Sequence, residues 1–158
     1  MLSTRMSRPL KLTLGCLALG LALAGCGHQK LGVPLTAATA DVHHGAVLFS
    51  ERCAGCHTFA YAGTHGSAAN VRTAQYNNGP NFDIRCERPI ARVLYAIENG
   101  GFSGAIMPQN VVVGQDAIDV AKFVATYAGS KAPHVPGVTP CSQKTVGSIS
   151  QELASAGK

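Results

Sequence analysis

Residues 53–57 read Cys-Ala-Gly-Cys-His, and this pentapeptide restricts what the chain can fold into more than any other part of the sequence. Two cysteines three positions apart, followed directly by a histidine, form the attachment pattern of haem c. Two thiols at this spacing, at the end of a helix, can reach the two vinyl groups on neighbouring edges of one porphyrin and form thioether bonds. We therefore expect one covalent haem c, attached through Cys53 and Cys56, with His57 as proximal ligand of its iron.

Two other kinds of site also use a C-x-x-C pair, and both fit this sequence less well. A thioredoxin-like redox pair belongs in a βαβ pattern, which is missing around residues 53–56. A structural zinc site needs a second ligand pair at comparable spacing, whereas Cys86 and Cys141 stand singly.

The rest of the chain predicts helices joined by loops. Apolar residues recur at helical spacing over residues 41–52, 89–99 and 116–127, and glycines follow the last two of these segments. Residues 58–81 are rich in Gly, Asn, Ser and Pro, which favours a long ordered loop. No stretch alternates convincingly, although residues 111–113 could form a short extended piece. The sequence therefore predicts an all-α core.

The N-terminal segment has the three zones of an export signal. A basic start precedes an apolar stretch over residues 12–24, which is shorter than the roughly 20 residues that a membrane-spanning helix needs. The closing tetrapeptide, residues 23–26, resembles the lipobox of bacterial lipoproteins, in which the cysteine is lipidated and becomes the new N-terminus. We expect Cys26 to carry the lipid. The alternative is ordinary signal cleavage, with Cys26 incidental.

These patterns divide the chain into four parts. We expect a lipoprotein signal peptide at 1–25, a flexible tether at 26–40, a haem domain at 41–129 and a Pro- and Ser-rich tail at 130–158. The protein would then be lipid-anchored on the extracytoplasmic face of a bacterial cell membrane.

The charge balance argues against nucleic acid as a partner. The whole chain has a formal charge of +5, but three of its 13 basic residues lie in the signal. The mature chain therefore keeps 10 basic and 8 acidic residues, a net charge of +2. No run of Lys and Arg survives to neutralise phosphates. Aromatic residues make up only 6% of the chain, so we expect few aromatic anchors and a core that depends on the haem.

Across about residues 41–129 the chain resembles a class I cytochrome c. Gly45 and Phe49 precede the first cysteine at the spacing of that family's N-terminal helix, and Phe123 resembles the aromatic partner of Phe49. Residues 79–81, Gly-Pro-Asn, resemble the segment whose proline carbonyl accepts the Nδ1 proton of the proximal histidine. Met107, followed by Pro108, resembles the distal ligand.

The resemblance implies a cytochrome c fold with three main helices around one haem. It implies that the Pro80 carbonyl fixes His57 and that Met107 completes six-coordinate iron, so that the protein is a monomeric one-electron carrier rather than an enzyme. Membrane-bound redox complexes would be its partners: a quinol-oxidising complex, a dehydrogenase or a terminal oxidase.

Several alternatives remain open from the sequence. Met107 could be a core filler, which would leave an open iron position and indicate a haem enzyme or gas sensor. His65 could be a distal ligand, although we favour a polar loop residue. The protein could also be a permanently docked subunit rather than a free shuttle. His43, His44 and His134 are interpreted as surface side chains.

Cys86 and Cys141 are the two cysteines of the mature chain without a role so far. In an oxidising compartment a disulfide between them is reasonable, and it would tie the tail to the segment before the second predicted helix. The alternative is two unrelated free thiols, and the resemblance does not require the bridge.

Overall fold

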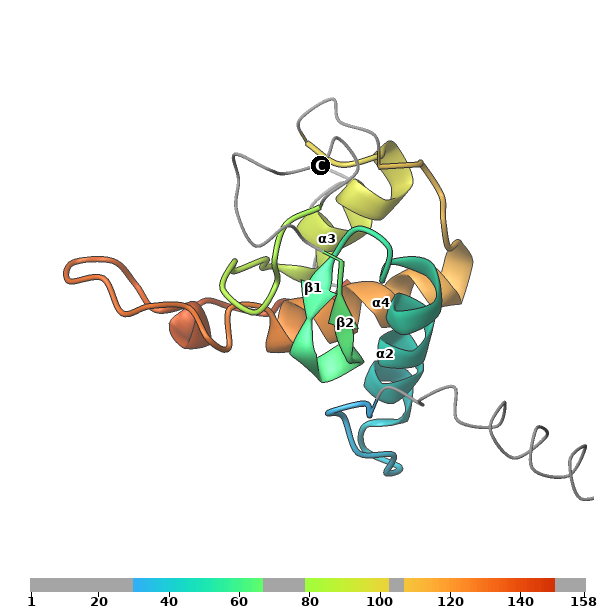
Figure 1. The fold of residues 1–158 in the computed structure, drawn as a ribbon, viewed down its shortest axis with the longest axis horizontal. Coiled ribbons are helices and arrows are strands. Elements are labelled where there is room, and N and C mark those ends of the chain that lie inside the picture. Colours follow the sequence, from blue (N-terminus) through green and yellow to red (C-terminus); the bar gives the residue numbers. More distant parts are fainter. Residues whose placement is uncertain (1–29, 67–78, 103–106, 150–158) are drawn as a thin grey trace, which may run out of the picture.

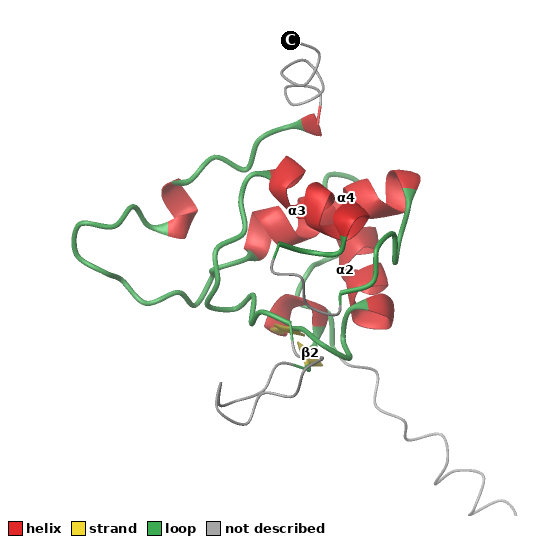
Figure 2. Cartoon of the chain, turned by 90° about the horizontal axis from the view of Figure 1, so that it is seen from above, coloured by secondary structure: helices red, strands yellow, loops and turns green. Residues whose placement is uncertain are grey.

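The computed structural model describes residues 30–66, 79–102 and 107–149, and three α-helices form its framework (Figures 1 and 2). A two-stranded antiparallel hairpin and two short 3₁₀ helices complete the described elements. In chain order these are α2 (Ala40–Arg52), β1 (Thr58–Phe59), η1 (Ala60–Ala62), β2 (Thr64–His65), α3 (Ile90–Asn99), α4 (Gly114–Tyr127) and η3 (Cys141–Gln143).

Helix α4 is the central element, because it packs against both α2 and α3. Half of its 14 residues are buried, including Val120, Phe123 and Val124. The three helices lie where the apolar periodicity predicts them, and the bounds differ by two residues at most. The prediction of an all-α fold with three main helices is confirmed by this arrangement.

Helices α2 and α4 cross at Gly45. A Cβ atom at this position would lie 2.5 Å from the backbone carbonyl carbon of Asp119 and 3.0 Å from Cβ of Phe123, with the Asp119 carbonyl oxygen closer still. Only glycine allows this approach. One turn further along α2, the ring of Phe49 meets that of Phe123 edge to face, with centroids 5.7 Å apart.

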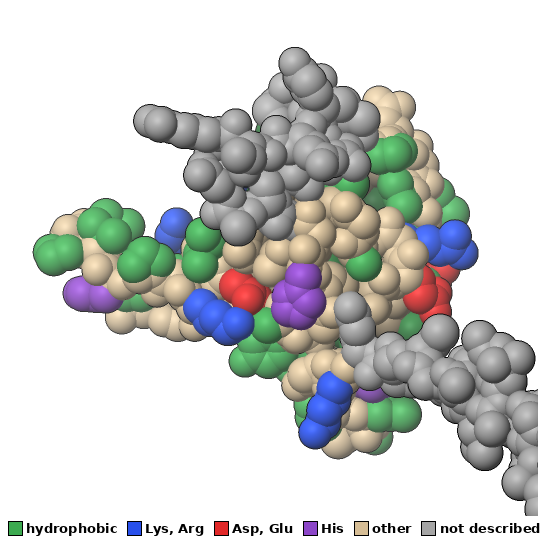
Figure 3. Space-filling model, viewed as in Figure 1, with side chains coloured by type: hydrophobic (Ala, Val, Ile, Leu, Met, Phe, Trp, Pro, Cys, Tyr) green, Lys and Arg blue, Asp and Glu red, His purple; other side chains and the backbone are tan. Residues whose placement is uncertain are grey.

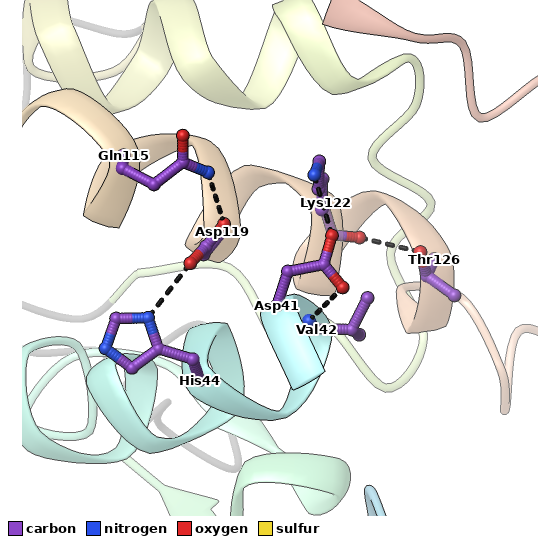
Figure 4. Close-up of polar contacts among 7 residues, drawn as sticks. All are labelled: Asp41, Val42, His44, Gln115, Asp119, Lys122 and Thr126. Atoms are coloured by element: carbon purple, nitrogen blue, oxygen red, sulfur yellow. Dashed lines mark hydrogen bonds and ion pairs between the residues drawn. The ribbon is translucent and has the colours of Figure 1, made fainter. Parts of the chain in front are cut away.

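Two polar pairs join the same helices at their surface (Figure 4). His44 Nδ1 lies 2.9 Å from a carboxylate oxygen of Asp119, and Gln115 donates to the other oxygen at 2.7 Å. The ion pair between Lys122 and Asp41 spans 2.7 Å. The hydrogen bond to Asp119 raises the pKa of His44, and the bond from Lys122 lowers the pKa of Asp41. The side chain of His44 is half exposed, as predicted for a surface residue, but it is hydrogen-bonded to Asp119.

Aromatic side chains fill more of the core than the composition suggests. Four of the five phenylalanines, Phe49, Phe59, Phe82 and Phe123, are buried and contact one another through neighbouring rings. The expectation of few aromatic anchors is wrong, because the small number of rings is concentrated at one place.

The segment after the C-x-x-C-H motif is more regular than the predicted loop. Strands β1 and β2 pair Thr58 with His65 and Phe59 with Thr64. Strands of two residues are too short to show an alternating pattern, which explains why the sequence did not reveal them. Residues 67–78 of the predicted loop lie outside the described residues.

Part of the predicted tether, residues 26–40, belongs to the folded domain. Val33 is 2% exposed and belongs to the hydrophobic core, and the N–H of Gly32 donates to the carbonyl of Tyr61 at 2.8 Å. The flexible tether therefore cannot extend to residue 40, because residues 31–39 fold back onto the domain. A single buried valine among small residues and Pro34 gave no periodic signal.

The described part of the tail also belongs to the domain. The guanidinium of Arg88 donates to the carbonyls of Ala125, Thr126, Cys141 and Lys144, and the N–H of Ile90 donates to Val146 O at 2.8 Å. A disulfide joins Cys86 to Cys141 with Cα atoms 5.6 Å apart. Between these anchors, residues 131–140 project from the body and expose apolar side chains (Figures 1 and 3).

Within the described residues, no helix has the length and apolar character needed to cross a membrane. The predicted signal peptide and Cys26 lie outside the described residues.

Candidate functional site

The C-x-x-C-H motif forms a tight turn at the end of α2. The N–H of Cys53 donates to Phe49 O at 2.9 Å, and the N–H groups of Cys56 and His57 both donate to Cys53 O, at 3.2 and 3.0 Å. The sulfurs of Cys53 and Cys56 and the imidazole of His57 therefore lie close together in the turn that ends α2. This outcome depends on local spacing, which is why the sequence predicts it.

Both motif cysteines are half-buried free thiols, whereas Cys86 and Cys141 are bridged. Burial, with a smaller contribution from Cys56, raises the pKa of Cys53 to about 12. The Cys53 sulfur is thus held as a neutral thiol in apolar surroundings. Two unpaired thiols in one turn are the groups that thioether attachment requires.

His57 is buried, with 8% of the residue exposed, and its orientation is fixed from two sides. Its ring stacks on Phe82, with centroids 4.7 Å apart and planes at 10°. Its Nδ1 lies 3.0 Å from the carbonyl oxygen of Pro80. Because a carbonyl can only accept, Nδ1 carries the proton and Nε2 keeps a lone pair for a metal. Burial lowers the pKa of His57, although the bond to Pro80 opposes this, so the neutral ring is favoured.

Gly79 makes room for this imidazole. A Cβ at this position would lie 2.5 Å from Nδ1 and 2.6 Å from Nε2 of His57. The N–H of Gly79 also donates to Cys56 O at 2.7 Å, which ties residues 79–80 to the motif. Gly79 thus leaves space for the imidazole, and the carbonyl of Pro80 accepts the hydrogen bond from its Nδ1.

Met107 reaches the core from the far end of α3. Gly100 and Gly101 end this helix with φ of +76° and +87°, values that favour glycine, and a Cβ on Gly101 would lie 3.9 Å from Sδ of Met107. The Met107 side chain is partly buried against the hydrophobic core. Met107 therefore packs against the same core cluster that contains Phe49 and Phe82, the two rings in contact with His57.

The donor set fits haem c. Two free thiols can form thioethers, a neutral imidazole with a fixed tautomer can bind iron, and a methionine sulfur can supply a soft second axial ligand. A structural zinc site would need four protein ligands close together. The described residues contain no group of three or more His, Cys, Asp and Glu side chains that could hold a metal ion.

A family model described as Cytochrome c matches residues 42–128, more than half of the chain. The chain belongs to the cytochrome c family. Members of this family bind haem c covalently through a cysteine pair, so haem c is the cofactor of this cytochrome c, and its general function is electron transport. No curated protein and no solved structure matches the chain.

The predicted site residues of this cytochrome c lie in different parts of the chain. Cys53, Cys56, His57 and Pro80 meet at one place, whereas Met107 comes from the segment beyond α3. Cys26 lies outside the described residues. The candidate alternative ligand, His65, is exposed at the end of β2.

Two residues that support the site were not identified from the sequence. Phe82 stacks on His57, and the buried hydroxyl of Thr64 donates to His57 O at 2.8 Å. Phe82 follows the Gly-Pro-Asn segment directly, two positions after the proline, and this position could have indicated a contact with the histidine. Nothing in the sequence marks Thr64, because its role depends on the hairpin.

Proposed function

We propose that this cytochrome c is a one-electron carrier of an extracytoplasmic respiratory or dehydrogenase-linked chain, with His57 and Met107 as the axial ligands of its iron. The hydrogen bond between His57 Nδ1 and Pro80 O carries the proposal. It fixes the tautomer in which Nδ1 carries the proton and Nε2 keeps a lone pair for the iron, and a bulkier residue at position 79 would prevent this contact.

Haem c, when bound, supplies an iron that takes up one electron in the ferric state and releases one in the ferrous state. The residues of this chain hold and tune it. The sulfurs of Cys53 and Cys56 would attach it, and the Pro80 carbonyl would keep the proton on Nδ1 and so increase the basicity of the His57 ring. The Met107 thioether, a soft ligand, would favour the ferrous form.

The residues around His57 suit a carrier that transfers electrons without binding a substrate at its iron. Phe49 and Phe82 contact its ring, with centroids 5.9 and 4.7 Å away, and leave little room for water. With both His57 and Met107 bound to it, the iron would have no coordination position left for peroxide or a diatomic gas. Electrons would then pass through the haem edge.

The proposed location rests on the N-terminal sequence alone. The lipobox-like residues 23–26 support export and lipidation at Cys26, which would hold the protein on the outer face of a bacterial cell membrane. Membrane-bound redox complexes are partners that a carrier at this surface could reach: a quinol-oxidising complex or dehydrogenase as donor and a terminal oxidase as acceptor.

The optical spectrum of the purified, oxidised protein tests the ligand assignment. A weak band near about 695 nm is expected for methionine bound to ferric iron. High-spin features, together with carbon monoxide binding to the reduced protein, would show an open position and support a haem enzyme or gas sensor instead. Rapid reduction by a quinol-oxidising membrane fraction, followed by reoxidation with an oxidase, would support the carrier role.

A further inference from the structure

The segment just after the expected lipid anchor is fastened to the domain, and this limits how far the domain can move from a membrane. The N–H of Gly32 donates to Tyr61 O at 2.8 Å, and Val33 is 2% exposed. The carbonyl of Val33 lies 2.8 Å from Nδ1 of His43 and accepts its proton. Residues 32 and 33 are therefore attached to both η1 and α2.

The next residues form a closed turn rather than a free arm. The Thr39 hydroxyl donates to Pro34 O at 2.6 Å and accepts from the N–H of Thr36 at 3.1 Å. The N–H of Thr39 in turn donates to Thr36 O at 3.1 Å. This turn leads directly into α2, so residues 31–40 continue the folded domain.

The chain length between the anchor and the domain is then short. Five residue steps separate Cys26 from Leu31, which packs against the core, and a fully extended chain covers at most about 3.5 Å per step, so these steps span about 18 Å. A tether that stayed free up to Ala40 would span up to about 50 Å by the same rule. Fastening the segment at Leu31 shortens the possible reach almost threefold.

The side chains next to this short link suit a lipid surface. Leu35, an apolar residue, is 69% exposed at the turn, and Lys30 is exposed at the start of the segment. Residues 27–40 contain no acidic residue, so nothing in this stretch repels anionic headgroups. Figure 3 shows basic and apolar side chains together at the lower end of the molecule, where Figure 1 places residues 30–39.

We propose that the face formed by residues 30–39 lies against the phospholipid surface in which the lipid on Cys26 is inserted, held there by the short link. This rests on the proposed lipidation of Cys26. Helix α3 lies at the opposite end of the molecule from this face (Figure 1), so the end of the domain with α3 points away from the lipid. The cytochrome c is then a carrier of fixed orientation rather than a domain swinging on a long arm.

Spin labels can test this orientation in the mature, lipidated holoprotein. Its other cysteines are expected to carry lipid or haem or to be bridged, so Leu35→Cys introduces one reactive thiol on the proposed face. Glu98→Cys, an exposed position on α3, is the matched control. Both labelled proteins are placed on vesicles of phosphatidylethanolamine and phosphatidylglycerol, and the accessibility of each nitroxide to oxygen and to a water-soluble nickel chelate is measured.

The expected result is a several-fold higher oxygen-to-nickel accessibility ratio for the label at position 35 than for the label at position 98. The difference should disappear in Cys26→Ser protein, and it should shrink when ten Gly and Ser residues are inserted between Gln29 and Lys30. Equal ratios at the two positions in acylated, vesicle-bound protein, or a ratio unaffected by the insertion, would overturn the orientation but leave the lipid anchor standing. An intact mass without acyl chains would overturn both.

Discussion

Replacing Gly45 by alanine tests whether the close crossing of α2 and α4 is a requirement of the fold. In an ordinary helix this change would stabilise the protein by about 1 kcal/mol, since alanine is the better helix former. Here the new Cβ would lie 2.5 Å from the backbone carbonyl carbon of Asp119. Carbon atoms in contact are normally about 3.5 to 4.0 Å apart, so α4 would have to shift by about 1 Å.

The contacted atoms belong to the backbone, so no side-chain rotation can relieve the overlap. Overpacking costs about 1 to 3 kcal/mol, and a backbone clash belongs at the upper end of that range. After subtracting the gain in helix propensity, we expect Gly45→Ala to lower the free energy of unfolding by about 2 kcal/mol.

The assay is guanidinium denaturation of haem-loaded protein, monitored by far-UV circular dichroism, with the two proteins compared at equal haem content. Gly55→Ala is the matched control, because a Cβ at Gly55 would meet no protein atom within 4 Å, and its effect at equal haem content should stay within about 0.5 kcal/mol. A Gly45→Ala protein that is as stable as the unmodified protein, or more stable, would refute the close-crossing argument.

Three further predictions concern the polar pair of His44 and Asp119 between α2 and α4, the methionine ligand and the disulfide. Asp119 raises the pKa of His44 above 6.5, so the stabilisation from this pair is complete below pH 6.5 and is lost as the pH rises through the raised pKa. His44→Gln should therefore destabilise the protein more at pH 5.5 than at pH 8.5. An equal loss of stability at both pH values in chemical denaturation would contradict this prediction. Met107→Ala should lower the reduction potential and open the iron to carbon monoxide while the haem stays covalently attached, and an unchanged potential in a redox titration would rule out Met107 as ligand. Replacing Cys86 and Cys141 by serine opens a loop with a sequence separation of 55 residues and should cost about 4 kcal/mol in chemical denaturation without loss of haem; a change below about 1 kcal/mol would show that the tail is held by its other contacts.

The features predicted correctly from the sequence are those that depend on local spacing. The apolar periodicity and the glycines at positions 100 and 129 delimit α3 and α4, and five consecutive residues define the C-x-x-C-H motif. The contact between His57 and Pro80 joins residues 23 positions apart, and only the family resemblance of the Gly-Pro-Asn segment indicated it.

The features that the sequence did not reveal depend on contacts between distant residues. Val33 is buried because its segment meets Tyr61 and His43, and nothing within residues 27–40 shows that such partners exist. The tail is fixed by Arg88, whose guanidinium reaches carbonyls 37 to 56 positions further along the chain. A composition rich in Pro, Ser and small residues looks the same in a free arm and in a segment held by such contacts.

The central claim is that one haem c is covalently bound to Cys53 and Cys56. It is tested most directly by combining a pyridine haemochrome spectrum with the intact mass of the mature protein. We expect the spectrum of haem c and a mass increase of one haem per chain, which should disappear in a variant with both cysteines replaced by alanine. A colourless protein with the mass of its polypeptide and lipid alone would contradict the account.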